Sequence, residues 1–474
     1  MGARTLRILI SFALVFGVFL YLASLQLKSL VPEKSEEEGI LGGPIPGLTR
    51  WQLAKFKEGK ELFQKNFTAQ EGLGPVYNGQ SCASCHGGTG IAGGGGQDPR
   101  TASITWFAKR VTNGRFAKEQ PKAIAAKMEL KDEDFMPNDG GPILLKKSIS
   151  TEFKDSLGLA ADCKIDAATE VPKQAEFQSK RFAPPLFGLG LVNAVPDPAF
   201  DFFAGQQLRD LKSAVRGKPA HLAPYLWGWA GNGKFGMKCQ EPTLFSMTAF
   251  EMSEELGLTT PILPQSRTSK APDAVPECMK TLAKEPNFTV QEINKLQFYL
   301  NTLGAPQAAD VTPESQMGYQ VFDKLGCGSC HLPAMETIDK VFMLNPDAEP
   351  WKMQMTEPGQ GAHGPNVTLA EDPKYFEIKA LEKQRVLAYS DFLLHDMGPA
   401  LQDGIAQGSA TGSEWRTTPL WGLRHKSFYL HDGRTKKLEE AIALHGGQAA
   451  KHAAEFKKLS DKEKANLLAF LRSL

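Results

Sequence analysis

Two short cysteine motifs constrain this chain more than any other feature. They are the Cys-x-x-Cys-His pentads CASCH at 82–86 and CGSCH at 327–331. Such a pentad can add both thiols to the vinyl groups of a haem while the adjacent histidine reaches the iron as proximal ligand. The alternative interpretation is a thioredoxin-like motif or half of a zinc site. The presence of two such pentads in one chain argues against this alternative. We therefore expect two covalent haem c groups, attached at Cys82, Cys85, Cys327 and Cys330 and ligated by His86 and His331.

The segments around the two pentads are alike. Before each pentad, a glycine precedes a phenylalanine by one helical turn, which lets a second helix cross close beneath the aromatic ring. After each pentad, a capping box opens an amphipathic helix, at 289–292 and at 460–463. The glycine–phenylalanine pairs are Gly59 with Phe63 and Gly318 with Phe322.

An opening helix, a haem pentad and a closing helix form the plan of a cytochrome c domain. The chain of 474 residues is long enough to hold this plan twice. We therefore expect a mainly α protein with two cytochrome c-like haem domains, at 51–304 and 312–474. The first is much longer, so it must carry a long insertion at about 140–285.

The N-terminus is typical of an exported protein. Arg4 and Arg7 precede an apolar stretch at 8–25, which reads as an export signal and is just long enough to span a bilayer. No clear cleavage site follows it. Residues 1–30 are therefore expected to be either a cleaved signal peptide or a membrane anchor, and residues 31–50 a linker. The rest of the chain is then periplasmic, either soluble or anchored to the inner membrane.

Charge and motifs exclude two classes of ligand. The formal charge is +1 and no long basic run occurs, whereas nucleic-acid binding needs concentrated lysine and arginine. The Gly-rich run at 87–96 lacks the Lys-Ser/Thr pair of a phosphate-binding loop, so nucleotide binding is not supported.

Three cysteines lie outside the pentads. In an exported protein Cys163, Cys239 and Cys278 allow at most one disulfide, and the sequence leaves all three pairings open.

The distribution of histidine suggests that the two irons differ. No histidine occurs between His86 and His221, so the far side of haem 1 is expected to be open or bound by a thioether such as Met128 or Met136. An open haem can bind a small substrate. The second half is rich in histidine, which favours a second strong ligand and an electron-transfer role for haem 2.

Several runs of sequence resemble one bacterial family. The C-terminal runs are AYSDFLLHDMGPAL from 388, EWRTTPLWGL from 414 and YLHDGRTKKLEEAIALHGG from 429. Further matches are NGQSCASCHG at 78–87, RFAPPLFGLGLVNAVPDPA at 181–199 and the segment 234–261. They resemble the di-haem oxidoreductase family of peroxidases and thiol oxidoreductases, which is related to di-haem cytochrome c peroxidases. The resemblance covers nearly the whole chain after the linker.

The resemblance implies roles around haem 2. The peroxidases have a methionine ligand after the LEEA helix start, and His445 stands at that position here. We therefore expect His331 and His445 as the two axial ligands, with Met397 as the alternative to His445. His431 is expected to support haem 2, and Arg416 and Arg424 to pair with haem propionates. A calcium ion between the domains is considered as a further cofactor.

The resemblance also bears on haem 1. The histidine ligand that the related peroxidases place after the first pentad is missing, which puts reductive activation by ligand loss in doubt. These enzymes use a carboxylate to move the peroxide proton. Glu251, Glu254 and Glu255 lie in a shared segment and are the candidate catalytic acids, with a solvated helix face as the alternative.

Together these features predict a periplasmic, peroxidase-like oxidoreductase. Haem 1 would react with hydrogen peroxide or another small oxidant, and haem 2 would relay electrons from a periplasmic donor protein. Trp106, Trp227 and Trp229 are candidate stepping points between them. The alternatives are a non-catalytic di-haem electron carrier and an oxidase of a thiol or protein side chain.

Overall fold

The structure is a computed structural model. It describes residues 32–88, 91–110, 116–117, 143–160, 162–163, 171, 175–225, 229–261, 286–347 and 375–474. The predicted signal or anchor, Met128, Met136, Trp227 and Cys278 lie outside the described residues. Among the helices that the structure describes, none is both long and apolar enough to cross a membrane.

The first group of helices surrounds the first pentad. Helix α2 (Arg50–Gln64) packs against α10 (Val290–Thr302), which also contacts α8 (Leu244–Leu256). A side chain at Gly59 would meet the Lys295 carbonyl and Tyr299 Cβ, the latter at 2.6 Å. The close helix crossing predicted from Gly59 is therefore confirmed.

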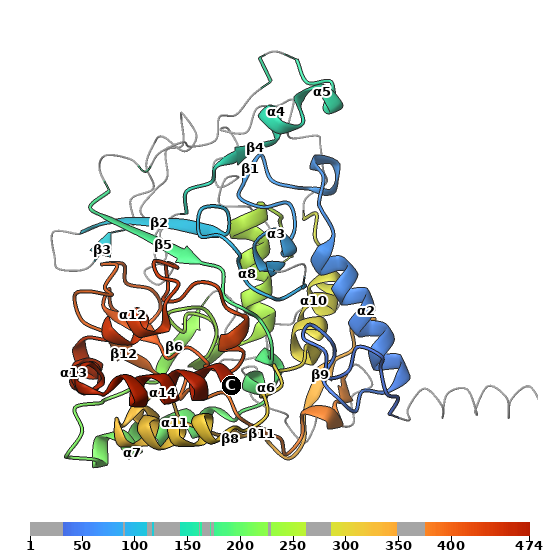
Figure 1. Ribbon diagram of the computed structural model, residues 1–474. Helices are drawn as coiled ribbons and strands as arrows, with labels where there is room; N and C mark the ends of the chain where they lie inside the picture. Colours follow the sequence, from blue (N-terminus) through green and yellow to red (C-terminus); the bar gives the residue numbers. More distant parts are fainter. Residues whose placement is uncertain are drawn as a thin grey trace, which may run out of the picture.

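The second group of helices surrounds the second pentad. Helix α11 (Pro313–Lys324) packs along α14 (Asp461–Ser473), with α12 (Leu438–Ala443) and α13 (Ala450–Lys458) beside them. Figure 1 shows this group on the opposite side of the molecule from α2 and α10. The capping boxes predicted at 289–292 and 460–463 open α10 and α14.

The described residues form five further α-helices, of which only α7 is longer than five residues. They are α3 (Ala83–His86), α4 (Ile149–Glu152), α5 (Lys154–Leu157), α6 (Leu189–Asn193) and α7 (Asp197–Arg209).

Small antiparallel sheets connect the helices, so the fold is mixed rather than purely α. Among the residues that the structure describes, the largest sheet has the order β3-β2-β5, and the other five have two strands each. Its strands are β2 (Ser103–Arg110), β3 (Phe116–Ala117) and β5 (Phe177–Phe182). The pairs are β1 (Val76–Tyr77) with β4 (Lys147–Ser148), β6 (Ala220–Tyr225) with β7 (Trp229–Gly233), β8 (Met335–Glu336) with β11 (Arg385–Val386), β9 (Phe342–Leu344) with β10 (Tyr375–Glu377), and β12 (Leu394–Asp396) with β13 (Glu414–Arg416).

Segments from 175–261 bind the C-terminal part of the chain. The Phe182 amide donates to the His431 carbonyl at 2.7 Å, and the Arg416 amide donates to the Met237 carbonyl at 2.9 Å. Lys218 and Leu394 exchange both backbone hydrogen bonds. These contacts bring strands far apart in sequence to the second pentad.

The structure narrows the cysteine pairings. Cys163 is disulfide-bonded, whereas Cys239 is buried and free. The two pairings that include Cys239 are therefore excluded.

Candidate haem sites

The second pentad opens onto a cavity. A 3-10 turn at Cys327–Ser329 follows α11, and Cys327, Cys330 and His331 line a cavity of about 270 Å³. The Nδ1 atom of His331 donates to the Tyr389 carbonyl at 3.0 Å, which fixes the ring orientation and leaves Nε2 free to bind a metal. Burial lowers the pKa of His331 to about 4, so the ring is neutral, as a metal ligand requires.

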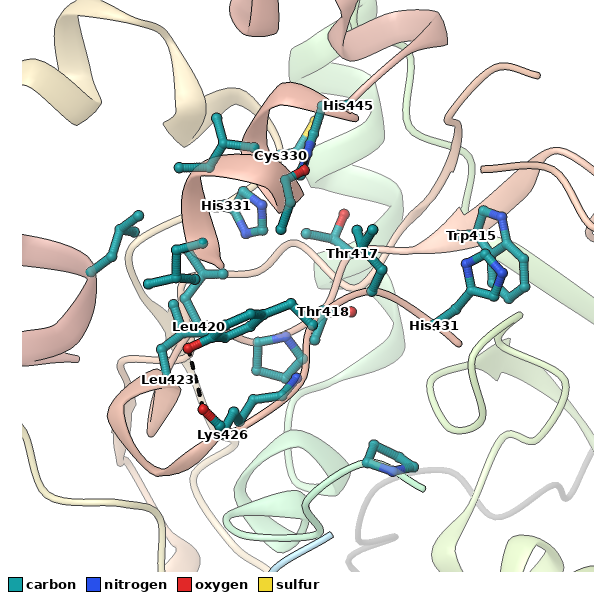
Figure 2. Close-up of a pocket in the computed structure, with 18 of the residues that line it drawn as sticks. Cys330, His331, Trp415, Thr417, Thr418, Leu420, Leu423, Lys426, His431 and His445 are labelled. Atoms are coloured by element: carbon teal, nitrogen blue, oxygen red, sulfur yellow. Dashed lines mark hydrogen bonds between the residues drawn. The ribbon is translucent and has the colours of Figure 1, made fainter. Parts of the chain in front are cut away.

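A second neutral imidazole lines the same cavity. His445 follows α12, and its Nδ1 atom donates to the Ala441 carbonyl at 2.8 Å. Burial lowers the pKa of His445 as well. Figure 2 shows His445 and His331 close together beside Cys330. Both rings are thus held through Nδ1, which leaves the Nε2 atom of each free at the cavity.

Two further residues at this cavity bear on the ligand assignment. Met397, the alternative ligand, also lines it. So does His452, which sequence reasoning did not single out and whose Nδ1 atom donates to the Leu325 carbonyl at 2.7 Å. The orientation of His452 depends on a backbone carbonyl 127 residues away, which no local pattern reveals.

The charges of the cavity wall fit a haem with its propionates. Arg416 lines the cavity, and its Nη1 atom is buried with no partner in the described structure. Lys426 also lines it, and burial, together with Arg416, lowers its pKa to about 8. Neither forms an ion pair with any described carboxylate. Two desolvated cations without counter-ions indicate an anionic group, and propionates would supply it.

Arg424 has a different environment from the one predicted. Its exposed guanidinium donates to the carbonyls of Gln307 and Ser473, and it is not among the residues that line the cavity. Lys426, two residues later, is the cavity cation that the sequence pattern missed.

His431 packs on an aromatic ring of the cavity wall. Its ring stacks on Trp415 with centroids 4.0 Å apart and an interplanar angle of 14°. Burial lowers the pKa of His431 to about 4. Figure 2 shows this stack at a part of the wall away from His331 and His445.

A charged histidine lies beside Cys330. Both ring nitrogens of His395 meet acceptors at 2.9 Å, Nε2 at Asp391 Oδ2 and Nδ1 at Gln448 Oε1. Burial opposes the charge, but the bond to Asp391 outweighs it and holds the pKa of His395 well above its ordinary value. Sequence reasoning attached no role to this pair.

The first pentad is held by the Gly-rich run. Cys82 precedes α3, which ends at His86, and the Gly93 amide donates to the His86 carbonyl at 2.7 Å. The Nδ1 atom of His86 donates to the Pro184 carbonyl at 2.9 Å. Burial lowers the pKa of His86, so this ring is also neutral with a free Nε2 atom.

The three candidate glutamates lie on α8 beside this pentad. Glu254 and Glu255 are 6% and 9% exposed, so they do not form a solvated helix face. Burial raises the pKa of the Cys85 thiol to about 12, and the carboxylates of Glu255 and then Glu251 add to the rise. The carboxylates are therefore close to Cys85.

The environments of Glu255 and Glu251 favour the protonated forms of their carboxylates. Glu255 Oε2 accepts from Asn78 Nδ2 at 3.1 Å, while Oε1 is buried and has no hydrogen-bond partner in the described structure. Burial raises the pKa of Glu255 to about 7. Burial and the neighbouring Glu255 and Glu254 raise the pKa of Glu251 well above its ordinary value. Such shifts are typical of functional carboxylates.

The two sites share one wall. Gly94–Gly96 and Phe182–Pro185 line the cavity of the second pentad. The same segments hold the first pentad, because Pro184 accepts the hydrogen bond from His86 and Gly93 donates to it. Trp106, a predicted stepping point, is 2% exposed and lies 4.9 Å from the Arg181 guanidinium next to this wall.

This arrangement defines a protein class: a chain with two histidine–cysteine haem sites set against a common wall. Its family follows from the sequence model that matches it. Residues 118–343 and 361–474 match the family described as "Di-haem oxidoreductase, putative peroxidase", and the chain belongs to this family. It is thus a di-haem oxidoreductase. The matched range begins after the first pentad. The covalent linkage and the calcium ion stay predictions.

Solved structures with some likeness are distant. A MauG-like protein associated with microbial copper homeostasis has 14% identity and a TM-score of 0.35, with 89% of each chain covered. The diheme peroxidase BthA from Burkholderia thailandensis has 14% identity and a TM-score of 0.27, with 51% of this chain and 65% of that chain covered. No curated protein matches the chain. These likenesses are too distant to assign an activity.

Proposed function

We propose that this di-haem oxidoreductase works in the periplasm and reduces hydrogen peroxide at the site of the first pentad. The site of the second pentad relays electrons from a periplasmic donor protein. The stretch at 8–25 exports the chain or anchors it to the inner membrane. The observation that carries the proposal is the buried carboxylate of Glu255 beside Cys85, with a pKa of about 7.

The reaction needs a group that exchanges protons near neutral pH. Reduction of one hydrogen peroxide to two water molecules takes up two electrons and two protons. When bound, the haem supplies an iron that binds the peroxide and exchanges electrons. Glu255 Oε1 takes the proton from one peroxide oxygen and returns it to the other, while Asn78 holds Oε2 at 3.1 Å. Glu251, whose pKa burial raises well above its ordinary value, holds a further proton beside it.

The second site is built for electron transfer. His331 and His445 present two neutral imidazoles to one cavity and would be the two strong ligands of its haem, which would then serve for electron exchange rather than substrate binding. Arg416 and Lys426 would hold the propionates. The shared wall keeps the two sites close, so electrons can cross without an external carrier.

Electron paramagnetic resonance of the ferric holoprotein tests the proposal. We expect one high-spin iron that binds cyanide and one low-spin iron that does not. Two low-spin irons, both inert to cyanide and peroxide, would instead indicate a non-catalytic electron carrier. A third outcome is an iron that binds cyanide in a protein that turns over simple electron donors slowly but oxidises a thiol or side chain of a partner. This outcome would indicate an oxidase of a thiol or protein side chain.

A further inference from the structure

Trp415 lies in an unusual electrostatic environment. One face of its ring stacks on His431, and the ammonium of Lys238 lies 4.1 Å from the ring centroid. The guanidinium of Arg181 lies 5.5 Å from the same centroid. The indole Nε1 donates to the Leu401 carbonyl at 2.8 Å, which fixes the ring. Two cations thus lie close to the ring of a tryptophan that is 7% exposed.

The position of Lys238 is fixed by several bonds. Its side chain is fully buried, and its Nζ atom bonds the carbonyls of Thr411 and Glu414 at 2.9 and 3.1 Å. It also pairs with Asp403 Oδ1 at 3.1 Å. Such a site holds the ammonium over the indole without competition from water.

The charges around Trp415 do not balance. Asp403 pairs with both Lys238 and Arg181, the latter at 3.0 Å, so one carboxylate serves two cations. Glu414 acts on Lys238 from a distance but is paired with Lys218 at 2.8 Å. His431 is neutral, since burial lowers its pKa to about 4. Glu251 also acts on Arg181, but burial raises the pKa of Glu251 well above its ordinary value and favours its neutral form. A positive charge therefore remains beside the ring.

We infer that Lys238 and Arg181 form a cationic clamp that protects Trp415 from oxidation. The step that the clamp opposes is the transfer of one electron from the indole to an oxidant. This transfer leaves an indole radical cation and a singly reduced oxidant. A cation over the ring face stabilises the neutral indole and destabilises the radical cation, most strongly where water is excluded.

The position of Trp415 suggests why the clamp is needed, and this role of the clamp rests on the proposed function. Trp415 lines the cavity of the second pentad, as do Phe182–Pro185 of the shared wall. A tryptophan at the second haem site, in the same cavity as the wall shared with the site that would react with peroxide, is exposed to electron loss. The clamp would direct electron loss away from this residue and preserve the wall.

Photo-oxidation of the ferric holoprotein tests the clamp without peroxide chemistry. Light and persulfate convert tris(bipyridine)ruthenium(II) to a one-electron oxidant, and peptide mass spectrometry then measures oxygen addition at Trp415. We expect about tenfold faster addition in Lys238→Met than in wild type. Lys238→Arg, which keeps the charge, should resemble wild type. Lys218→Met, which removes a lysine paired with Glu414 but not over the ring, should also resemble it.

A second measurement needs no variant that removes the charge. Burial lowers the pKa of Lys238 to about 8. Addition at Trp415 should therefore rise in wild type between pH 7 and pH 9.5 but stay flat in Lys238→Arg. Equal addition in wild type and Lys238→Met, or no difference between wild type and Lys238→Arg across this pH range, overturns the inference. Parallel treatment with hydrogen peroxide separates the two proposals. If photo-oxidation of Trp415 depends on Lys238 but the protein does not react with peroxide, the clamp is supported and the proposed peroxidase function is wrong.

Discussion

At the scale of single residues, backbone carbonyls orient the three histidines that we propose as iron ligands. His86, His331 and His445 each donate from Nδ1 to a carbonyl, at 2.9, 3.0 and 2.8 Å. This fixes the tautomer that leaves Nε2 free. The acceptors of His86 and His331 are Pro184 and Tyr389, both remote in sequence. The pentads therefore predict that His86 and His331 are iron ligands, but they do not predict which backbone carbonyls orient the two rings.

Replacement of His445 by methionine tests its role as a ligand. We expect His445→Met to raise the reduction potential of haem 2, because a thioether stabilises the reduced iron more than an imidazole does. Electron paramagnetic resonance and a spectroelectrochemical titration would measure the change. Met397→Leu serves as the control for the alternative ligand. An unchanged haem 2 spectrum in His445→Met, with a changed one in Met397→Leu, would reverse the assignment.

Glu255 should make the stability of the protein depend on pH. Its folded-state pKa is raised to about 7, so the folded protein binds a proton that the unfolded chain releases at lower pH. The stabilisation is therefore fully present below about pH 4.3 and is lost as the pH rises through 7. We expect Glu255→Gln to reduce this loss by about 3 kcal/mol at most. Urea unfolding at pH 5 and pH 8 would measure the free energy of unfolding of both proteins. The same loss of free energy between the two pH values in wild type and Glu255→Gln would contradict the prediction.

At the scale of elements, helix crossings were predictable and small sheets were not. Gly59 and Gly318 both lie where a side chain would strike a crossing helix. The pattern of glycine before phenylalanine is local, so the sequence carries it. By contrast, β12 and β13 bring His395 opposite Trp415 through a pairing that depends on tertiary contacts. The mainly α expectation missed such strands, because runs of three residues are too short to show a period.

The crossing of α11 and α14 should not tolerate a side chain at Gly318. An added Cβ would meet the Asn466 carbonyl and lie 2.7 Å from Phe470 Cβ. We expect Gly318→Ala to destabilise the fold by about 1–3 kcal/mol, as overpacking typically does. Gly205→Ala in α7 is the matched control, since its Cβ would meet only the Arg209 side chain at 4.0 Å. Equal denaturation midpoints for the two variants would contradict the packing argument.

At the scale of the whole molecule, the shared wall is the feature that the sequence did not show. The Gly-rich run and RFAPPLFGLGLVNAVPDPA were both recognised, but as separate motifs. In the structure the Gly96 amide donates to the Ala183 carbonyl at 2.9 Å, which joins the two segments. A pairing between segments more than 80 residues apart has no local signature. The wall makes the two haem sites one unit.

A substitution in the wall should therefore disturb both haem sites at once. Gly95 has a φ of +77°, and an added Cβ would lie 2.8 Å from the Pro185 nitrogen and 3.0 Å from the Pro184 carbonyl carbon. Gly95→Ala should displace this segment, weaken the bond from His86 to Pro184 and reshape the cavity of the second pentad. We expect the resonance signals of both irons to change. Gly158→Ala is the control, because Gly158 also has a positive φ, +60°, but nothing lies within 4 Å of its added Cβ. A change confined to the first iron would show that the wall does not couple the sites, since Pro184 and Pro185 line the second cavity directly.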